Sequence, residues 1–141
     1  MFDLNLMSAI QLVQHCKNEL RQNRASLVLV SSGASTSAYE TWGSYCMSKS
    51  ALNMFASVLG AEEKLFTTVS VRPGVVDTRM QSLIRENGKD VMPDSLFQKF
   101  TDLKKDGKLL DPSLPGTVIA DLALEPRHDL SGKFFSWDSI P

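Results

Sequence analysis

The chain has 141 residues, 43% of them hydrophobic and 22% charged, which is long enough for one globular domain with a real core but not for two. Fifteen basic residues against sixteen acidic ones give a net charge of -1, which excludes the basic surface of a nucleic-acid or membrane-surface binder. No apolar run approaches a membrane span, no secretory signal opens the chain, and only two histidines are present, which argues against a metal site.

Apolar residues at spacings of three and four predict an amphipathic helix over residues 1–22. The members of this stripe are Phe2, Leu6, Ile10, Val13, Cys16 and Leu20. The next segment, Ser26–Ser32, is apolar at every position from Leu27 to Val30, which is typical of a strand covered on both faces. The two cysteines, Cys16 and Cys46, are interpreted as reduced core thiols of a cytoplasmic protein, with a disulfide as the alternative.

A loop of small residues, Gly33–Gly43, precedes a second predicted helix over residues 43–64. Its expected buried stripe consists of Ala51, Leu52, Phe55, Val58 and Leu59. The stretch TTVSVRPG then predicts a second strand, because Pro73 and Gly74 cannot continue one.

The rest of the chain alternates in the same way. Residues 77–107 are polar and are expected to hold one or two short helices, the clearer one near 96–103. A short apolar helix over 117–124 and a last strand over 132–138 follow. This order predicts an α/β fold with a parallel sheet and right-handed crossovers. With about three strands, residues 1–141 would form a single portion of a doubly wound, Rossmann-like domain that is entered in the middle.

Tyr45 and Lys49 are four residues apart in the second predicted helix, so a phenol and an ammonium lie on one helix face. An ammonium one turn away favours the phenolate, which makes the phenol a readier proton donor. Taken alone, the pair has an ordinary alternative, a tyrosine ring packed by the aliphatic stem of a lysine.

Ser32 adds to the pattern because it lies thirteen residues before Tyr45, at the carboxyl end of the first strand, where open α/β sheets build their sites. Its alternative is a hydroxyl that only satisfies loop amides.

The segment RPGVVDT leaves the second strand at the same edge of the sheet, although a plain strand-to-loop breaker would explain its Pro-Gly pair. Asn5 lies early in the first helix, where a polar amide needs partners, and its alternative is a helix-terminal cap.

Together these residues resemble the short-chain dehydrogenase/reductase family. The resemblance rests on Asn5 in FDLNLMSAIQL, on Ser32 in LVLVSSGAS, on Tyr45 and Lys49 in YCMSKSALN, and on VRPGVVDTRM. It covers essentially the whole chain, as the carboxyl-terminal catalytic half of that fold. The softer motifs DTRMQ and DGKLLDPSLPGTVIADLALE are most similar to fungal benzil reductases and sepiapterin-reductase-like carbonyl reductases.

The resemblance implies an oxidoreductase that reduces a ketone, aldehyde or diketone with a nicotinamide cofactor. Tyr45 would be the general acid, Lys49 would tune it and hold the nicotinamide ribose, and Ser32 would donate a hydrogen bond to the substrate carbonyl. Asn5 would keep a water behind Lys49. The implied cofactor-binding residues are Tyr45, Lys49, Pro73, Gly74, Val76 and Thr78.

The family's glycine-rich turn, Gly-x-x-x-Gly-x-Gly, matches none of the eight glycines, so the adenosine and pyrophosphate site is expected to be absent from this chain. The resemblance favours NADP(H) over NAD(H), and it implies a homo-oligomer paired through the helices at 1–22 and 43–64. Two alternatives come from other classes. One is a truncated, catalytically silent fragment that acts as an oligomerisation or binding partner. The other is a plain α/β module that binds a different ligand at the same edge.

Overall fold

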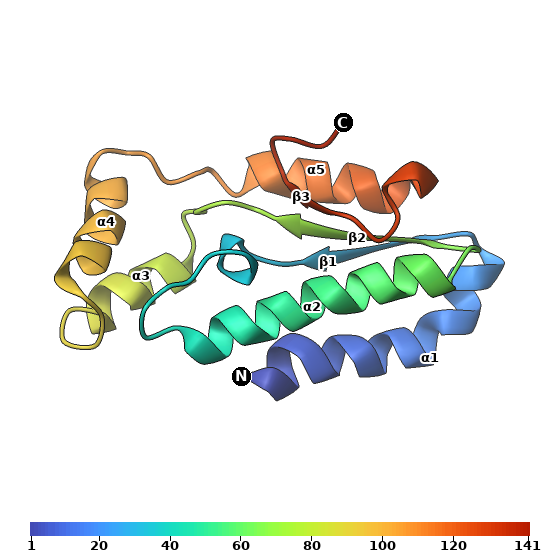
Figure 1. Cartoon of the computed structure of the whole chain (residues 1–141). Helices are drawn as coiled ribbons and strands as arrows, with labels where there is room; N and C mark the ends of the chain where they lie inside the picture. Colours follow the sequence, from blue (N-terminus) through green and yellow to red (C-terminus); the bar gives the residue numbers. More distant parts are fainter.

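A three-stranded parallel sheet forms the centre of the protein, seen in a computed structural model that describes residues 1–141 (Figure 1). The strands are β1 (Ser26–Val30), β2 (Thr67–Arg72) and β3 (Phe134–Ser136), in the order β1-β2-β3. The register pairs Val28 with Val69 and Val71 with Phe135. The α/β class and the partial Rossmann-like sheet predicted from the sequence are confirmed.

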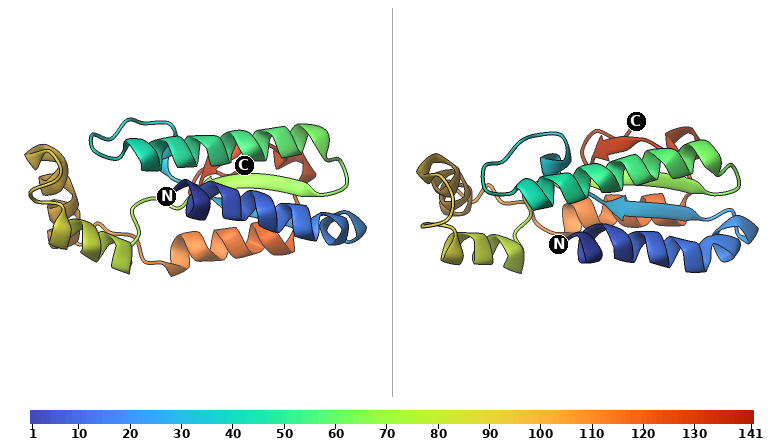
Figure 2. Two further views of the ribbon diagram at one scale, coloured as in Figure 1. Left: turned by 90° about the horizontal axis from the view of Figure 1, so that it is seen from below. Right: turned by 60° about the horizontal axis from the view of Figure 1, so that its bottom comes forward.

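Helices cover both faces of this sheet (Figure 2). On one face, α2 (Gly43–Glu62) packs Leu52 and Ala56 against Leu29, and the start of the first helix joins this cluster. That first helix is α1 (Ser8–Gln22), preceded by one π-helical segment, Asp3–Met7. On the other face, α5 (Ser113–Leu124) packs Leu122 against Val69 and Val71.

The two crossovers of the sheet have opposite hands. The strand order advances in one direction from β1 to β3, but α2 and α5 cover opposite faces. The expectation that every crossover is right-handed is therefore wrong for one of the two.

Strand β1 is covered on both faces, as its unbroken apolar run predicted. Val28 faces the cluster with α5 and Leu29 faces the cluster with α2, because neighbouring side chains in a strand point to opposite faces. The strand is nevertheless an edge, since β2 is its only partner, and 46% of Val30 is exposed.

Two helical stripes differ from the prediction. Cys16 is exposed rather than buried, and Val13 is the only residue of α1 that is fully buried. In α2 the buried positions are Ser48, Leu52, Ala56 and Leu59, and Val58 is exposed. Both cysteines are free thiols, so the disulfide alternative is wrong as well.

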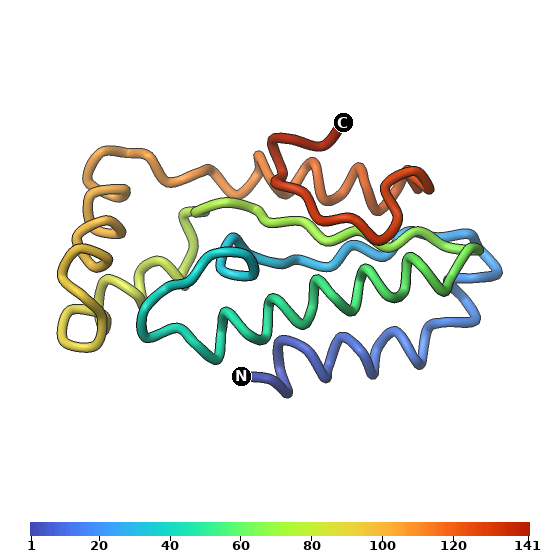
Figure 3. The backbone as a smooth tube through the Cα atoms, in the orientation of Figure 1, coloured from blue at the N-terminus to red at the C-terminus, as the bar shows by residue number.

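A pair of helices extends beyond the sheet at the end where the loops after β1 and β2 emerge (Figure 3). They are α3 (Arg79–Asn87) and α4 (Asp94–Lys105), and they bear out the two short helices expected in this polar region. The last strand is shorter than the predicted 132–138, because only Phe134–Ser136 pairs with β2. None of the helices combines the length and the apolarity needed to cross a bilayer.

Candidate active site

The carboxyl ends of β1 and β2 form the edge at which the predicted site residues gather. Ser32 follows β1 by two residues, and Pro73 directly follows β2. Helix α2 begins at Gly43 and runs back along the sheet, so its first turns, which carry Tyr45 and Lys49, lie at the same edge. Parallel strands place all their carboxyl ends on one side, which is why segments distant in sequence meet here.

Lys49 connects α2 to the end of β1. Its Nζ donates a hydrogen bond to the carbonyl oxygen of Val30 at 2.9 Å. The same Nζ lies 5.9 Å from the centroid of the Tyr45 ring, within the range of a cation–π contact. Burial of the side chain lowers the pKa of Lys49. The contact between ammonium and ring agrees with both sequence interpretations of this pair, and it shows that the two side chains face one another.

Ser32 has a defined hydrogen-bonding role in the loop after β1. Its Oγ accepts a hydrogen bond from the Ala34 amide at 3.2 Å and so caps a short 3-10 helix, Gly33–Ser35. Because the oxygen accepts, the hydroxyl proton of Ser32 is available to another acceptor. The turn-hydroxyl interpretation of Ser32 is thus correct as a description of its local bond, and it is compatible with a donor role toward a substrate.

A chain of side-chain hydrogen bonds from α2 fixes the same loop. Asn53 Nδ2 donates to Ser35 Oγ at 2.8 Å, and Ser35 Oγ donates in turn to the Ser32 carbonyl oxygen at 2.6 Å. Ser50 Oγ donates to the Ser35 carbonyl oxygen at 2.7 Å. Sequence reasoning missed these three residues. The available signal was that Asn53 lies four residues after Lys49, and therefore on the helix face that meets the loop.

Asn5 is not a helix cap. It lies inside the π-helical segment, and its Nδ2 donates to Ser48 Oγ at 3.1 Å and contacts Met1 Sδ at 3.0 Å. Ser48 is fully buried and its Oγ donates to the Tyr45 carbonyl oxygen at 2.8 Å. Asn5 is therefore connected through Ser48 to the backbone of the turn that carries Tyr45.

The segment after β2 is held in an extended path. Val76 forms a parallel bridge with Leu110, in which the Asp77 amide and the Val75 carbonyl make the hydrogen bonds. In a parallel bridge of this kind, the amide and carbonyl of Val76 itself point away from Leu110. Gly74 has a φ of +80°, a left-handed backbone conformation that favours glycine over every other residue. Thr78 is exposed just before α3, and its side chain makes no capping hydrogen bond.

The parallel sheet with helices on both faces defines a Rossmann-like α/β protein, and the tyrosine–lysine contact lies at the carboxyl edge where such sheets build their sites. A family model described as short chain dehydrogenase matches residues 1–89. The chain belongs to the short-chain dehydrogenase/reductase family, and the recognition made from the motifs is confirmed.

Relatives with named activities are reductases or oxidoreductases. An uncharacterised oxidoreductase of Schizosaccharomyces pombe is 39% identical over 141 residues, which is 99% of this chain and 57% of the relative. A benzil reductase of Saccharomyces cerevisiae that forms (S)-benzoin is 40% identical over 98% of this chain and 55% of its own length. A sepiapterin reductase of Mus musculus is 38% identical over 77% of this chain and 41% of its own length. These relatives make the chain part of an enzyme family.

The fold agrees with a solved relative. The crystal structure of a short chain dehydrogenase/reductase from Saccharomyces cerevisiae superposes with a TM-score of 0.96 at 39% identity, over 99% of this chain and 56% of the other. The chain thus spans a little over half the length of the relatives that it matches most fully.

Proposed function

We propose that this chain carries the catalytic part of an NAD(P)H-dependent carbonyl reductase, which reduces a ketone, aldehyde or diketone to an alcohol. The observation that carries the proposal is the contact between Tyr45 and Lys49 at the carboxyl edge of the sheet, beside the loop that holds Ser32. The named reductases among the relatives support carbonyl reduction in general terms.

Tyr45 would donate the proton that a carbonyl oxygen needs as it becomes an alkoxide. The Lys49 ammonium lies within cation–π range of its ring, which holds the phenol beside the end of β1. The bond from Lys49 to the Val30 carbonyl fixes this ammonium at the edge of the sheet. Ser32 would donate its free hydroxyl proton to the substrate carbonyl, which orients the carbonyl and stabilises the developing charge.

The residues present fit the nicotinamide end of a cofactor. The amide and carbonyl of Val76 face away from the Leu110 bridge, and Gly74, two residues earlier, is exposed. These groups, with Pro73 and Thr78, would hold the carboxamide, and Lys49 would hold the ribose. The cofactor, when bound, supplies the hydride. We propose NADP(H) rather than NAD(H) from the family resemblance, and we propose that this chain lacks the adenosine and pyrophosphate site, because no glycines have the required spacing.

We also propose that the protein pairs with copies of itself through α1 and α2. Both helices leave large apolar side chains exposed, among them Leu12 on α1 and Met54 on α2. Light scattering on the purified chain tests this proposal, and a monomer at all concentrations would contradict it.

The central test follows the oxidation of NADPH by an aromatic diketone, with cofactor fluorescence as a separate measure of binding. We expect Tyr45→Phe to lower the turnover rate by at least about a hundredfold while cofactor binding is kept, because only the proton donor is removed. Tyr39→Phe is the matched control. A Tyr45→Phe variant that keeps the wild-type rate would refute the role of Tyr45. A wild-type chain that neither binds nor oxidises NADPH would favour the silent binding or oligomerisation partner.

A further inference from the structure

Trp42 stands at the centre of an aromatic stack that no motif predicted. It is half-buried directly before α2, and its ring stacks on those of Tyr39 and Phe100. Both neighbours have centroids 5.4 Å away, at interplanar angles of 20° and 14°. A residue of the loop before α2 and a residue of α4 thus both stack on Trp42.

The stack attaches α4 to the rest of the protein. Phe100 is 4% exposed and is the only fully buried residue of α4. Lys99, its neighbour, places Nζ 5.5 Å from the Tyr39 ring centroid. Lys104 of α4 also forms an ion pair with Asp77, and because both side chains are exposed this pair contributes little. The stack on Trp42 therefore connects α4 with the loop that precedes α2.

The same Trp42 ring also contacts Tyr45. The two centroids are 5.8 Å apart and the rings meet edge to face at 84°. The Tyr45 ring therefore lies against Trp42 and has the Lys49 ammonium within cation–π range. A single rigid indole makes the contacts with Phe100 and with Tyr45, so it cannot follow a shift of α4 without changing its contact with the phenol.

We propose that Trp42 is a positioning residue that couples the placement of α4 to the orientation of Tyr45. This inference rests on the proposed function, in which Tyr45 is the proton donor. It adds that the donor is oriented from outside the motif, by Phe100 of α4, which lies 55 residues after Tyr45 in the chain. Trp42 itself does not react. Its role is to transmit the position of α4 to the phenol ring.

The first test needs no catalytic activity. NMR of the ring resonances of Trp42 and Tyr45 is compared for the wild type, Phe100→Leu and Phe97→Leu. Phe97 is a half-buried phenylalanine of α4 outside the stack, so its variant is the matched control. We expect Phe100→Leu to shift the resonances of both Trp42 and Tyr45, and Phe97→Leu to leave Tyr45 unchanged. A shift at Trp42 without one at Tyr45 would overturn the coupling. Should Phe100→Leu fail to fold, Phe100→Met, which keeps a large apolar side chain, is used in its place.

The second test measures kcat and KM separately by steady-state kinetics. We expect Trp42→Leu to lower kcat about tenfold with little change in KM, and Trp42→Phe to restore most of the loss, because a smaller ring can still stack. A rise in KM at unchanged kcat would overturn the positioning role. If the wild-type chain shows no turnover, the proposed function fails, while the NMR comparison still decides whether α4 and Tyr45 are coupled.

Discussion

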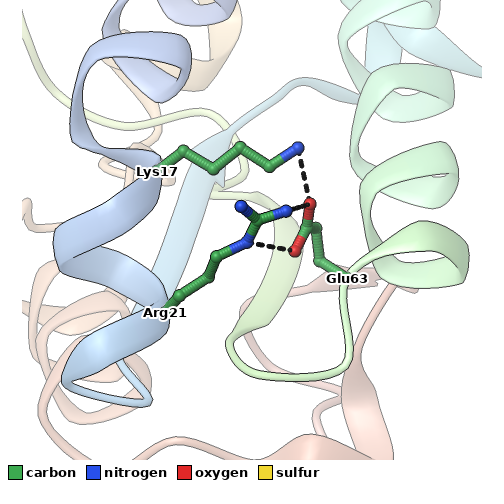
Figure 4. A network of polar contacts seen from close by, with 3 residues as sticks. All are labelled: Lys17, Arg21 and Glu63. Carbon is green, nitrogen blue, oxygen red and sulfur yellow. Dashed lines mark hydrogen bonds and ion pairs between the residues drawn. The ribbon is translucent and has the colours of Figure 1, made fainter.

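Replacing Glu63 by glutamine is expected to destabilise the protein by about 2 kcal/mol near neutral pH, and by much less near pH 2. Glu63 follows the last residue of α2 and is 6% exposed. Arg21 of α1 donates to both carboxylate oxygens, at 3.0 Å and 2.8 Å, and Lys17 forms an ion pair with the same group (Figure 4). This network joins the ends of two helices on one face of the sheet.

The magnitude follows from the lowered pKa of Glu63. The hydrogen bonds from Arg21 and then from Lys17 lower this pKa from 4.5 to about 2. At about 1.4 kcal/mol per unit, a shift of this size corresponds to about 3 kcal/mol. The actual contribution to the free energy of unfolding is smaller than this figure. The side chains of Lys17 and Arg21 are 33% and 40% exposed, so water screens their interaction with Glu63. We therefore expect about 2 kcal/mol of stability from this carboxylate.

The sign of the pH dependence is fixed by the direction of the shift. A carboxyl whose pKa is lower in the folded state stabilises that state above its ordinary pKa, and the contribution disappears as the pH falls through the folded value. The stability gained from Glu63 should thus be fully present above pH 4.5 and should be lost progressively down to about pH 2.

Urea unfolding followed by circular dichroism measures this contribution, as the difference between wild type and Glu63→Gln at several pH values. Glu62→Gln is the matched control, because Glu62 is exposed and forms no ion pair. The reasoning would be refuted by a difference that stays constant from about pH 7 to about pH 2, or by one no larger than that of the control.

Two further predictions concern residues of α2, one through its packing and one through a hydrogen bond to the Ser32 loop. Gly60→Ala should destabilise the protein by about 2 kcal/mol, because a Cβ there would lie 2.4 Å from the Gly132 Cα atom. Thermal unfolding measures the change, and Gly116→Ala, where a Cβ meets nothing within 4 Å, should be neutral or slightly stabilising. Asn53→Ala should lower kcat about tenfold, since it removes the hydrogen bond that holds Ser35 and, through it, the Ser32 carbonyl. Steady-state kinetics measure this loss, with Asn23→Ala at an exposed site as the control, and an unchanged kcat would show that the Ser32 loop does not need Asn53.

Several features of the fold could be predicted because they depend only on neighbouring residues. The unbroken apolar run from Leu27 to Val30 predicted β1 and its two covered faces, and Pro73 and Gly74 marked the end of β2. The predicted stripe of α2 was partly wrong, because Ser48 and Ala56 are buried while the larger Val58 is exposed. Ser48 is buried where it accepts a hydrogen bond from Asn5, and Ala56 is buried in the cluster with Leu29 of β1. Hydrophobicity along one helix does not reveal such contacts.

The candidate site was also predicted only in part. The α-helical period alone put Tyr45 and Lys49 on one face, and that pairing is present in the structure as a contact between ammonium and ring. No local pattern indicates that Asn5 would meet Ser48, and the spacing of Asn53 from Lys49 indicates a helix face but not Ser35 as the partner. These contacts join different elements, and no local periodicity encodes them.

The sequence by itself therefore determined the order of elements, the parallel α/β class, and the tyrosine and lysine one turn apart, since each depends on residues a few positions from one another. The tertiary structure decided which distant groups meet. It brought Phe100 of α4 onto Trp42, buried Glu63 under Arg21 of α1, and left Cys16 exposed. The physical reason is that periodicity sets which face a side chain occupies, whereas its partner is set by how whole helices pack across the sheet.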